Sequence, residues 1–329
     1  MKISKTIIYA ALTLWAGAAS SQETVTLASP APGPAAINGF LADWAKTVTA
    51  GSGGALTVNF VPGGVLGREG QLRDRVAKGV IDIAWDFQGY YPGNYDKSAV
   101  VEQPFQFKTA AQGSRAFQAI YEAGLLKGEY DDVKVLGLFT FPNASLMLVK
   151  PLDSLEGMDG RKITAQNPTM QVAAEALGGL ALNLPIPDWY PALSRGTIDG
   201  AIVTFTAVPA FRLNEVMTEF IDVPLGGNPA MFIMNPAKYA GLSAEAKAAI
   251  DAHSGHAFSK PIGSFLDALN DKSKGVAGAN GNRVRELSPE DAKAWQARLQ
   301  PLTAAWLAAD PARSDILKAY VSELGNGND

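Results

Sequence analysis

The chain has 329 residues, 47% of them hydrophobic, and this length favours two domains because single hydrophobic cores stop growing near ~250–300 residues. Its formal net charge is −4 and its pI is near 5.4, so it lacks the basic surface that nucleic acids require, and we expect no nucleic-acid partner. The absence of cysteine excludes disulfides, thiolate catalysis and cysteine-ligated zinc.

The N-terminus has the pattern of a secretory signal peptide over residues 1–21. Lys2 and Lys5 precede an apolar run over 7–19, and small residues follow it, as they do at signal-peptidase sites. The apolar run is short for a membrane span, which needs ~20 residues. We therefore expect an exported protein that works in the periplasm without this segment.

Strands and helices alternate in the first half of the mature chain. A strand begins at residue 24, a helix with one apolar face lies within 35–54, and a strand follows over 56–62. A second helix within 67–79 leads into the nearly all-apolar strand 80–85. Such runs are typical of strands buried on both faces of a parallel sheet, and the order predicts right-handed βαβ units.

The second half repeats this order, with a strand over 162–166 that leads into a helix. The segments "RVAKGVIDIAW" (75–85) and "ALSRGTIDGAIV" (192–203) share a helix end, a glycine and an Ile-Asp pair before an apolar strand. We interpret them as matching elements of two similar lobes, in which Asp82 and Asp199 anchor the starts of strands.

The C-terminal third is helical. Ser243 caps a very long helical pattern over 244–275, in which Pro261 predicts a kink. A short strand over 282–287 follows, and then a helix that starts at Pro289. This helix is longer than a single lobe requires, so we expect it to brace both lobes.

Catalytic motifs are scarce. The sequence has no phosphate-binding loop, no dinucleotide-binding glycine pattern after a strand and no nucleophile elbow. His253 and His256 are spaced to share a metal with a third ligand, but they lack the H-E-x-x-H arrangement, and we interpret them as polar residues on a solvated helix face. We therefore predict that the protein is not an enzyme and uses neither a metal nor a cofactor.

An aromatic cluster follows the strand 80–85. The segment "AWDFQGYYPGNY" (84–95) places Trp85, Phe87 and three tyrosines past the carboxyl end of a parallel strand, with Asp86 among them. Ligands of open α/β sheets bind at this edge. Some of these rings pack in the core, and we expect at least two of them to line a cleft.

Taken together, the motifs resemble the solute-binding proteins of tripartite ATP-independent periplasmic (TRAP) transporters over nearly all of the mature chain. The strongest stretch is "FVPGGVLGREGQLRDRVAKGVIDIAW" (60–85), and later family segments are similar to "EQPFQF" (102–107), "PLDSLEGMDGRKITAQNP" (151–168) and "ALSRGTIDGAI" (192–202). The resemblance implies an α/β fold of the periplasmic binding protein type. Two similar lobes with parallel-dominated sheets would be connected by crossing strands and a long helix.

The same resemblance divides the chain between the lobes. It implies a first lobe over 22–141 plus about 230–270 and a second lobe over 142–229 plus about 271–329. The lobes would close on a small organic ligand, for which the family default is a carboxylate. The protein would act as a monomer and deliver this ligand to TRAP permease subunits in the membrane, which an ion gradient drives without ATP.

In the family, the strand 162–166 usually carries an arginine that forms a two-pronged salt bridge to the ligand carboxylate. By alignment this position is Thr164, and no hydroxyl matches that fork of donors. Either another cation has taken over, for which Arg68 is favoured over Arg212, or the ligand differs. In the second case, Asp86 and its aromatic neighbours would receive a cationic or neutral ligand.

The predicted ligand site combines side chains from both lobes. Thr164 and Asn143 would orient the ligand by neutral hydrogen bonds, and aromatic rings would supply most of the contact. The candidate ligand-binding residues are Arg68, Trp85, Asp86, Phe87, Asn143, Thr164, Asn167, Thr204 and Phe205. Three alternatives to transport remain open, namely a ligand-sensing module for a membrane receptor, an enzyme on the same scaffold, and a scaffold that binds nothing.

Overall fold

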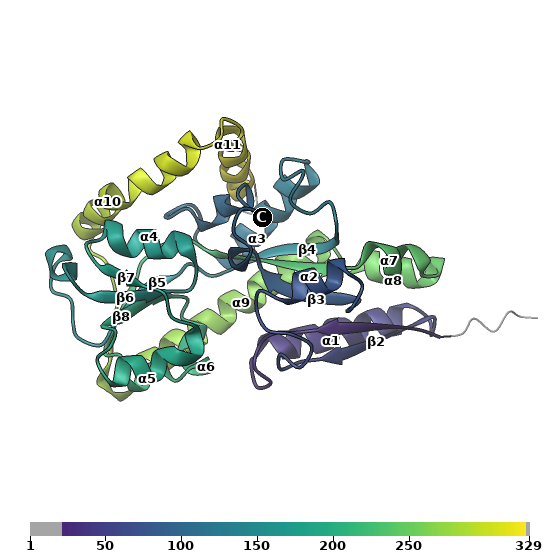
Figure 1. The fold of residues 1–329 in the computed structure, drawn as a ribbon, viewed down its shortest axis with the longest axis horizontal. Helices are drawn as coiled ribbons and strands as arrows, with labels where there is room; N and C mark the ends of the chain where they lie inside the picture. The colour runs from purple at the N-terminus through teal and green to yellow at the C-terminus, as the bar shows by residue number, and fades with distance from the viewer. Residues whose placement is uncertain (1–21, 327–329) are drawn as a thin grey trace, which may run out of the picture.

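Two β-sheets with helices on their faces form the two lobes of the molecule (Figure 1). The computed structural model describes residues 22–326, so the predicted signal peptide lies outside the described residues. Within that range, no helix combines the length and the apolar character that a membrane span needs. The predicted α/β class with two lobes is confirmed, and each sheet mixes parallel with antiparallel pairs.

The first sheet carries the βαβ units predicted for the N-terminal half. Its strands, in spatial order, are β2 (Leu56–Val61), β1 (Glu23–Ala28), β3 (Ile83–Phe87), β10 (Asn228–Met234) and β4 (Lys134–Phe141). β1 pairs in parallel with β2 and β3, whereas β10 lies antiparallel between β3 and β4. The helices of this lobe are α1 (Ile37–Gly51), α2 (Leu72–Ala77), α3 (Ala110–Glu122), α7 (Pro236–Gly241) and α8 (Ala244–Ala252).

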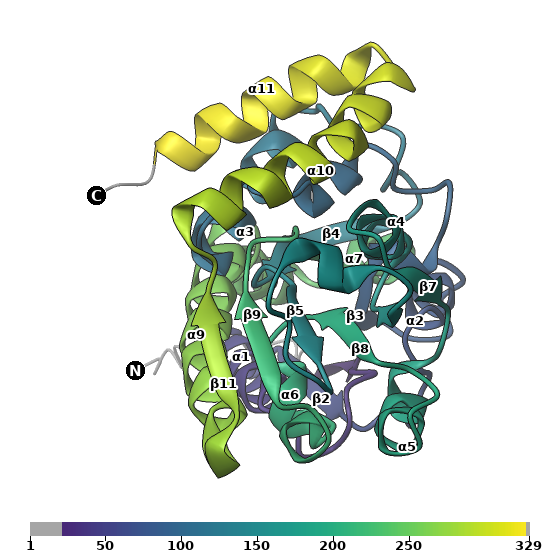
Figure 2. The same ribbon diagram turned by 90° about the vertical axis from the view of Figure 1, so that its left-hand side faces the viewer.

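The second sheet is seen in Figure 2. Its strands, in spatial order, are β11 (Arg283–Glu286), β9 (Glu219–Asp222), β5 (Ser145–Leu148), β8 (Gly200–Val203), β6 (Lys162–Ala165) and β7 (Leu180–Leu182). β6 pairs in parallel with β7 and β8, and β5 is antiparallel to β8 and β9. The helices of this lobe are α4 (Pro168–Ala176), α5 (Trp189–Ser194), α6 (Ala207–Ala210) and α10 (Pro289–Ala308).

The long helix α9 (His256–Ala277) braces both lobes, as predicted. It packs against α3 and β4 of the first lobe and against α6 and β11 of the second, and Figure 1 shows it running from one lobe to the other. The last helix, α11 (Ala312–Gly325), differs from the expected division of the chain, because it returns to the first lobe and packs against α3. The other lobe boundaries stay a prediction.

The predicted single helix over 244–275 with a kink at Pro261 is wrong. The segment forms two helices, α8 and α9, with a break at Gly255, and Pro261 lies inside α9. Gly255 has a φ of +60°, which only glycine adopts without steric cost and which ends the helical path. The indole N–H of Trp44 donates to the carbonyl of His253 at 2.9 Å, which ties this break to α1.

Asp82 and Asp199 anchor strands in the same way in the two lobes, as predicted. Oδ2 of Asp82 accepts the backbone N–H of Thr26 in β1 at 2.8 Å, and Oδ2 of Asp199 accepts that of Lys162 in β6 at 2.8 Å. Each carboxylate directly precedes one strand and holds the neighbouring parallel strand. The repeated Ile-Asp pair therefore reflects the same strand contact in each lobe.

Candidate ligand-binding site

A cavity of about 390 Å³ lies between the lobes, within the size range of small-molecule sites. The first lobe contributes the loop before α1 and the ends of β3 and β4. The second lobe contributes the ends of β6 and β8 together with α6, and α9 lines the cavity as well. The lining residues with aromatic, polar or charged side chains are Glu69, Trp85, Phe87, Tyr90, Phe141, Gln166, Thr204, Thr206, Phe211, Asn228, Lys272 and Ser273.

Aromatic rings of the first lobe form one wall of the cavity. The ring centroids of Trp85, Phe87 and Phe141 lie 5.1, 5.1 and 6.0 Å apart, and Tyr90 extends the wall 6.2 Å from Phe87. The indole N–H of Trp85 donates to Ser29 Oγ at 2.9 Å, so this buried donor is satisfied and the ring is held in place. The wall suits a ligand with a flat apolar ring.

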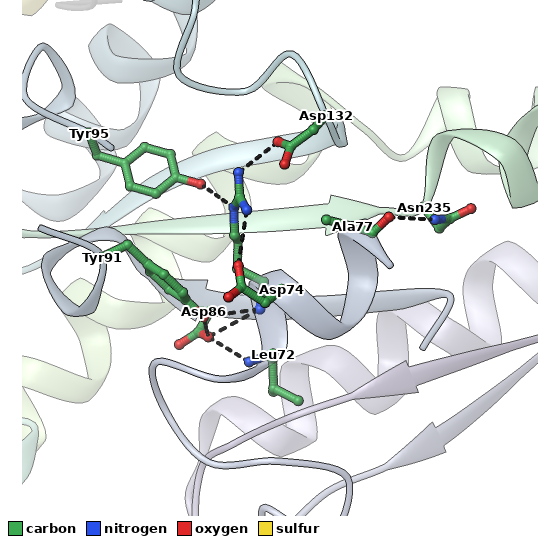
Figure 3. Close-up of polar contacts among 9 residues, drawn as sticks. Leu72, Asp74, Ala77, Asp86, Tyr91, Tyr95, Asp132 and Asn235 are labelled. Atoms are coloured by element: carbon green, nitrogen blue, oxygen red, sulfur yellow. Dashed lines mark hydrogen bonds and ion pairs between the residues drawn. The ribbon is translucent and has the colours of Figure 1, made fainter. Parts of the chain in front are cut away.

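Asp86 faces away from this wall, because successive side chains of a strand point to opposite faces. Its buried carboxylate accepts the backbone N–H groups of Gly70, Leu72 and Arg73 and the hydroxyl of Tyr91, at 2.6–3.3 Å. Figure 3 shows Asp86 with Leu72 and Tyr91. These bonds hold the start of α2 and the loop before it against β3. Asp86 therefore supports the site from behind and does not line the cavity.

Polar groups at the ends of β6 and β8 line the cavity from the second lobe. Gln166 follows β6, and its Oε1 accepts the backbone N–H of Thr204 at 3.3 Å. The hydroxyls of Thr204 and Thr206 lie 2.7 Å apart. Asn228, at the start of β10 in the first sheet, accepts a hydrogen bond at 3.4 Å from Asn167, which caps α4 of the second lobe. The second lobe thus supplies amide and hydroxyl groups to a polar ligand end.

Glu69 and Lys272 are the charged side chains of the lining, within the part of the chain that the structure describes. Burial raises the pKa of Glu69 to about 7, and the Asp86 carboxylate adds to this shift. The hydroxyl of Tyr90 donates to Glu69 Oε2 at 3.4 Å. Lys272 is exposed on α9. As the pH falls through about 7, Glu69 takes up a proton and the negative charge of the lining decreases.

Three of the predicted ligand-binding residues, Trp85, Phe87 and Thr204, line the cavity. Arg68 does not line it, and its side chain is exposed to solvent. Thr164 is fully buried in β6, and its Oγ1 has no hydrogen-bond partner among the described residues. The position at which the resemblance implies an arginine thus holds a buried hydroxyl outside the cavity lining.

The remaining predicted residues have partners within the protein. Nδ2 of Asn143 donates to the carbonyl of Phe107 at 2.8 Å, and Oδ1 of Asn167 accepts the N–H of Met170 at 2.9 Å. Phe205 is buried in the core of the second lobe. None of these three predicted residues lines the cavity.

Sequence reasoning misses the contribution of α9, whose residues Leu266, Leu269, Lys272, Ser273 and Val276 line the cavity. Only the tertiary path of the helix brings them to the aromatic wall, so no local pattern marks them. Gln166 is different, since it lies two residues beyond Thr164 and alternation places it on the same face of the strand. The two-residue spacing from Thr164 is therefore a sequence signal that could have identified Gln166 as a candidate site residue.

Comparisons with known proteins agree on one family. The family model "Bacterial extracellular solute-binding protein, family 7" matches residues 31–310. A marine metagenome TRAP solute-binding protein specific for aromatic acid ligands, in complex with metahydroxyphenylacetate, is similar with a TM-score of 0.88 and 28% identity, over 94% of this chain and 100% of that one. A TRAP solute-binding protein from Rhodoferax ferrireducens with copurified benzoate shares the fold, with a TM-score of 0.85 at 24% identity, over 92% of this chain and 97% of that one.

A curated relative, an outer membrane transporter protein of Comamonas testosteroni, is 28% identical over 270 residues, which are 80% of this chain and 79% of the relative. The range matched by the family model spans both lobes, the crossings between them and α9. The resemblance to TRAP solute-binding proteins is therefore confirmed. The chain belongs to family 7 of the bacterial extracellular solute-binding proteins, and it is an extracytoplasmic receptor that captures a small organic solute for a TRAP transporter.

Proposed function

We propose that this receptor binds a small aromatic carboxylate between its lobes and delivers it to a TRAP membrane permease. The observation that carries the proposal is the wall of Trp85, Phe87 and Phe141, because aromatic rings pack against a flat ring in specific stacked or edge-on geometries. The marine metagenome relative, which is specific for aromatic acids, supports the same ligand class.

The charges around the cavity favour an acid over an amine. Lys272 supplies a positive charge, whereas the raised pKa of Glu69 weakens the negative charge that an amine would need. Asp86, the other candidate partner for a cation, is held by backbone N–H groups on the far side of β3. The amide and hydroxyl groups of the second lobe supply donors to a carboxylate.

One chain contributes both walls of the cavity, which supports action as a monomer.

We propose that the mature receptor works in the periplasm, where it binds the acid and releases it unchanged. Incubation of the protein with 3-hydroxybenzoate, followed by NMR of the recovered compound, distinguishes binding from an enzyme on the same scaffold, which would convert the compound.

A thermal-shift screen of the mature protein tests the ligand class. We expect 3-hydroxybenzoate to raise the unfolding midpoint by at least a few degrees, because a ligand at ~100 times its Kd adds ~2.7 kcal/mol to stability. Cyclohexanecarboxylate lacks the aromatic ring, succinate lacks any ring and benzylamine reverses the charge, so each is expected to give a smaller shift. A shift with succinate or benzylamine and none with any aromatic acid would contradict the proposal.

Arg68→Ala is expected to leave the affinity for 3-hydroxybenzoate within about twofold of the wild-type value, because exposed charges away from a site act weakly through screening solvent. Arg212→Ala is expected to behave alike, since Arg212 is exposed and pairs with Glu215 at 2.7 Å. Calorimetric titration measures both. A loss of roughly tenfold or more in Arg68→Ala would place that residue in the ligand site after all.

A further inference from the structure

A side-chain amide beside the cavity lies two residues after Thr164, the position at which the resemblance implies an arginine. Gln166 directly follows β6, and its backbone N–H donates to the carbonyl of Ile202 in β8 at 3.3 Å. Its side-chain Oε1 accepts the backbone N–H of Thr204, just beyond β8, at 3.3 Å. The two bonds to one neighbouring segment fix both the backbone and the side chain of Gln166.

The amide of Gln166 has one orientation that satisfies this contact. Thr204 offers an N–H donor, so the amide oxygen must face it, and the flipped amide would set two donors against each other. The amide nitrogen therefore points the other way. Nε2 is buried and has no hydrogen-bond partner among residues 22–326, although Gln166 lines the cavity. A buried donor without a partner is unfavourable, so the site lacks one acceptor.

We propose that Nε2 of Gln166 donates to the carboxylate of the bound aromatic acid. A neutral amide, fixed in direction by the backbone of Thr204, then takes over part of the role that an arginine at the position of Thr164 has in the family. The inference rests on the proposed function. A hydrogen bond from a neutral donor to a charged group contributes roughly ten- to hundredfold in affinity, so Gln166 would decide between acids and compounds that lack the charge.

Gln166→Glu tests this role with little change of shape. The glutamate keeps an oxygen for the N–H of Thr204 and replaces the amide donor by an acceptor. Gln166→Met removes the donor without adding charge. Gln296→Glu adds the same charge on an exposed position of α10 and serves as the control. Calorimetric titrations of the full mature protein with 3-hydroxybenzoate and with its neutral analogue 3-hydroxybenzamide give the ratio of the two affinities.

We expect Gln166→Glu to weaken 3-hydroxybenzoate binding by roughly tenfold or more and to affect 3-hydroxybenzamide much less, so that the preference for the acid falls. Gln166→Met should lower the acid affinity in the same direction, and Gln296→Glu should leave both affinities unchanged. Equal losses for acid and amide, or unchanged acid affinity in both Gln166 variants, would overturn the role of Gln166 and leave the proposed function standing. A wild-type protein that binds no aromatic acid would instead overturn the proposed function and this inference with it.

Discussion

Replacing Asp86 with alanine is expected to lower the free energy of unfolding by about 3–5 kcal/mol, because it leaves several buried donors without an acceptor. The carboxylate accepts the N–H groups of Gly70, Leu72 and Arg73 and the hydroxyl of Tyr91. Urea unfolding followed by circular dichroism measures the loss.

Asp74→Ala provides the matched control. Asp74 lies on α2, the helix whose start Asp86 holds, and Figure 3 shows it beside Asp86. Its ion pair with Arg73 is partly exposed, with 51% of the Asp74 side chain accessible. Exposed pairs contribute 0–1 kcal/mol, so this variant should unfold nearly as the wild type does. Equal stabilities for Asp86→Ala and Asp74→Ala would mean that the buried carboxylate does not hold α2 and the loop with Glu69 against β3.

Replacing Glu102 with glutamine is expected to raise the free energy of unfolding at pH 8 by up to about 3 kcal/mol. Glu102 ends a short 3₁₀ helix (Ser98–Glu102) of the first lobe, is 6% exposed, and accepts a hydrogen bond from the hydroxyl of Thr169 in α4 of the second lobe. Burial raises its pKa from 4.5 to about 7. One pKa unit corresponds to about 1.4 kcal/mol, and glutamine avoids the cost of the buried charge.

The sign of the pH dependence follows from the raised pKa. The unfolded chain releases the Glu102 proton near pH 4.5, whereas the folded chain keeps it up to about pH 7. The folded state binds more protons in this window, so wild-type stability falls as the pH rises through it. The gain from Glu102→Gln should therefore vanish at pH 4 and be complete at pH 8. Urea unfolding at several pH values, with the exposed Glu175→Gln on α4 as control, measures this; a gain that does not change with pH would exclude a titrating Glu102.

The sequence predicts the fold well where local patterns decide it. Alternation of strands and helices gives the βαβ order around β1–β3, and the repeated Ile-Asp pair gives the contacts of Asp82 and Asp199. It fails where the outcome depends on distant partners. The amphipathic pattern of α11 does not say which lobe it joins, and the break at Gly255 is a backbone conformation that the pattern over 244–275 hides.

The candidate site likewise contains residues that local patterns predict and residues whose position depends on distant partners. Trp85 and Phe87 are predictable because they lie at the carboxyl end of a strand, β3, that ends at the ligand edge of a sheet. Alternation along that strand also excludes Asp86 from their face, so naming all three residues together is inconsistent with strand geometry. Lys272 is not predictable locally, because a solvated helix face and a cavity wall have the same sequence pattern. Its position depends on how α9 crosses between the lobes.

The place of β10 in the first sheet has a consequence for the order of folding. β10 fills the gap between β3 and β4, yet the second lobe's strands β5 to β9 separate it from β4 along the chain. Until residues 228–234 are available, β3 and β4 each present an unpaired edge, which is a template for association with other chains. Contacts of such long sequence separation also form slowly. The first lobe therefore completes its sheet only after the chain has passed through the second.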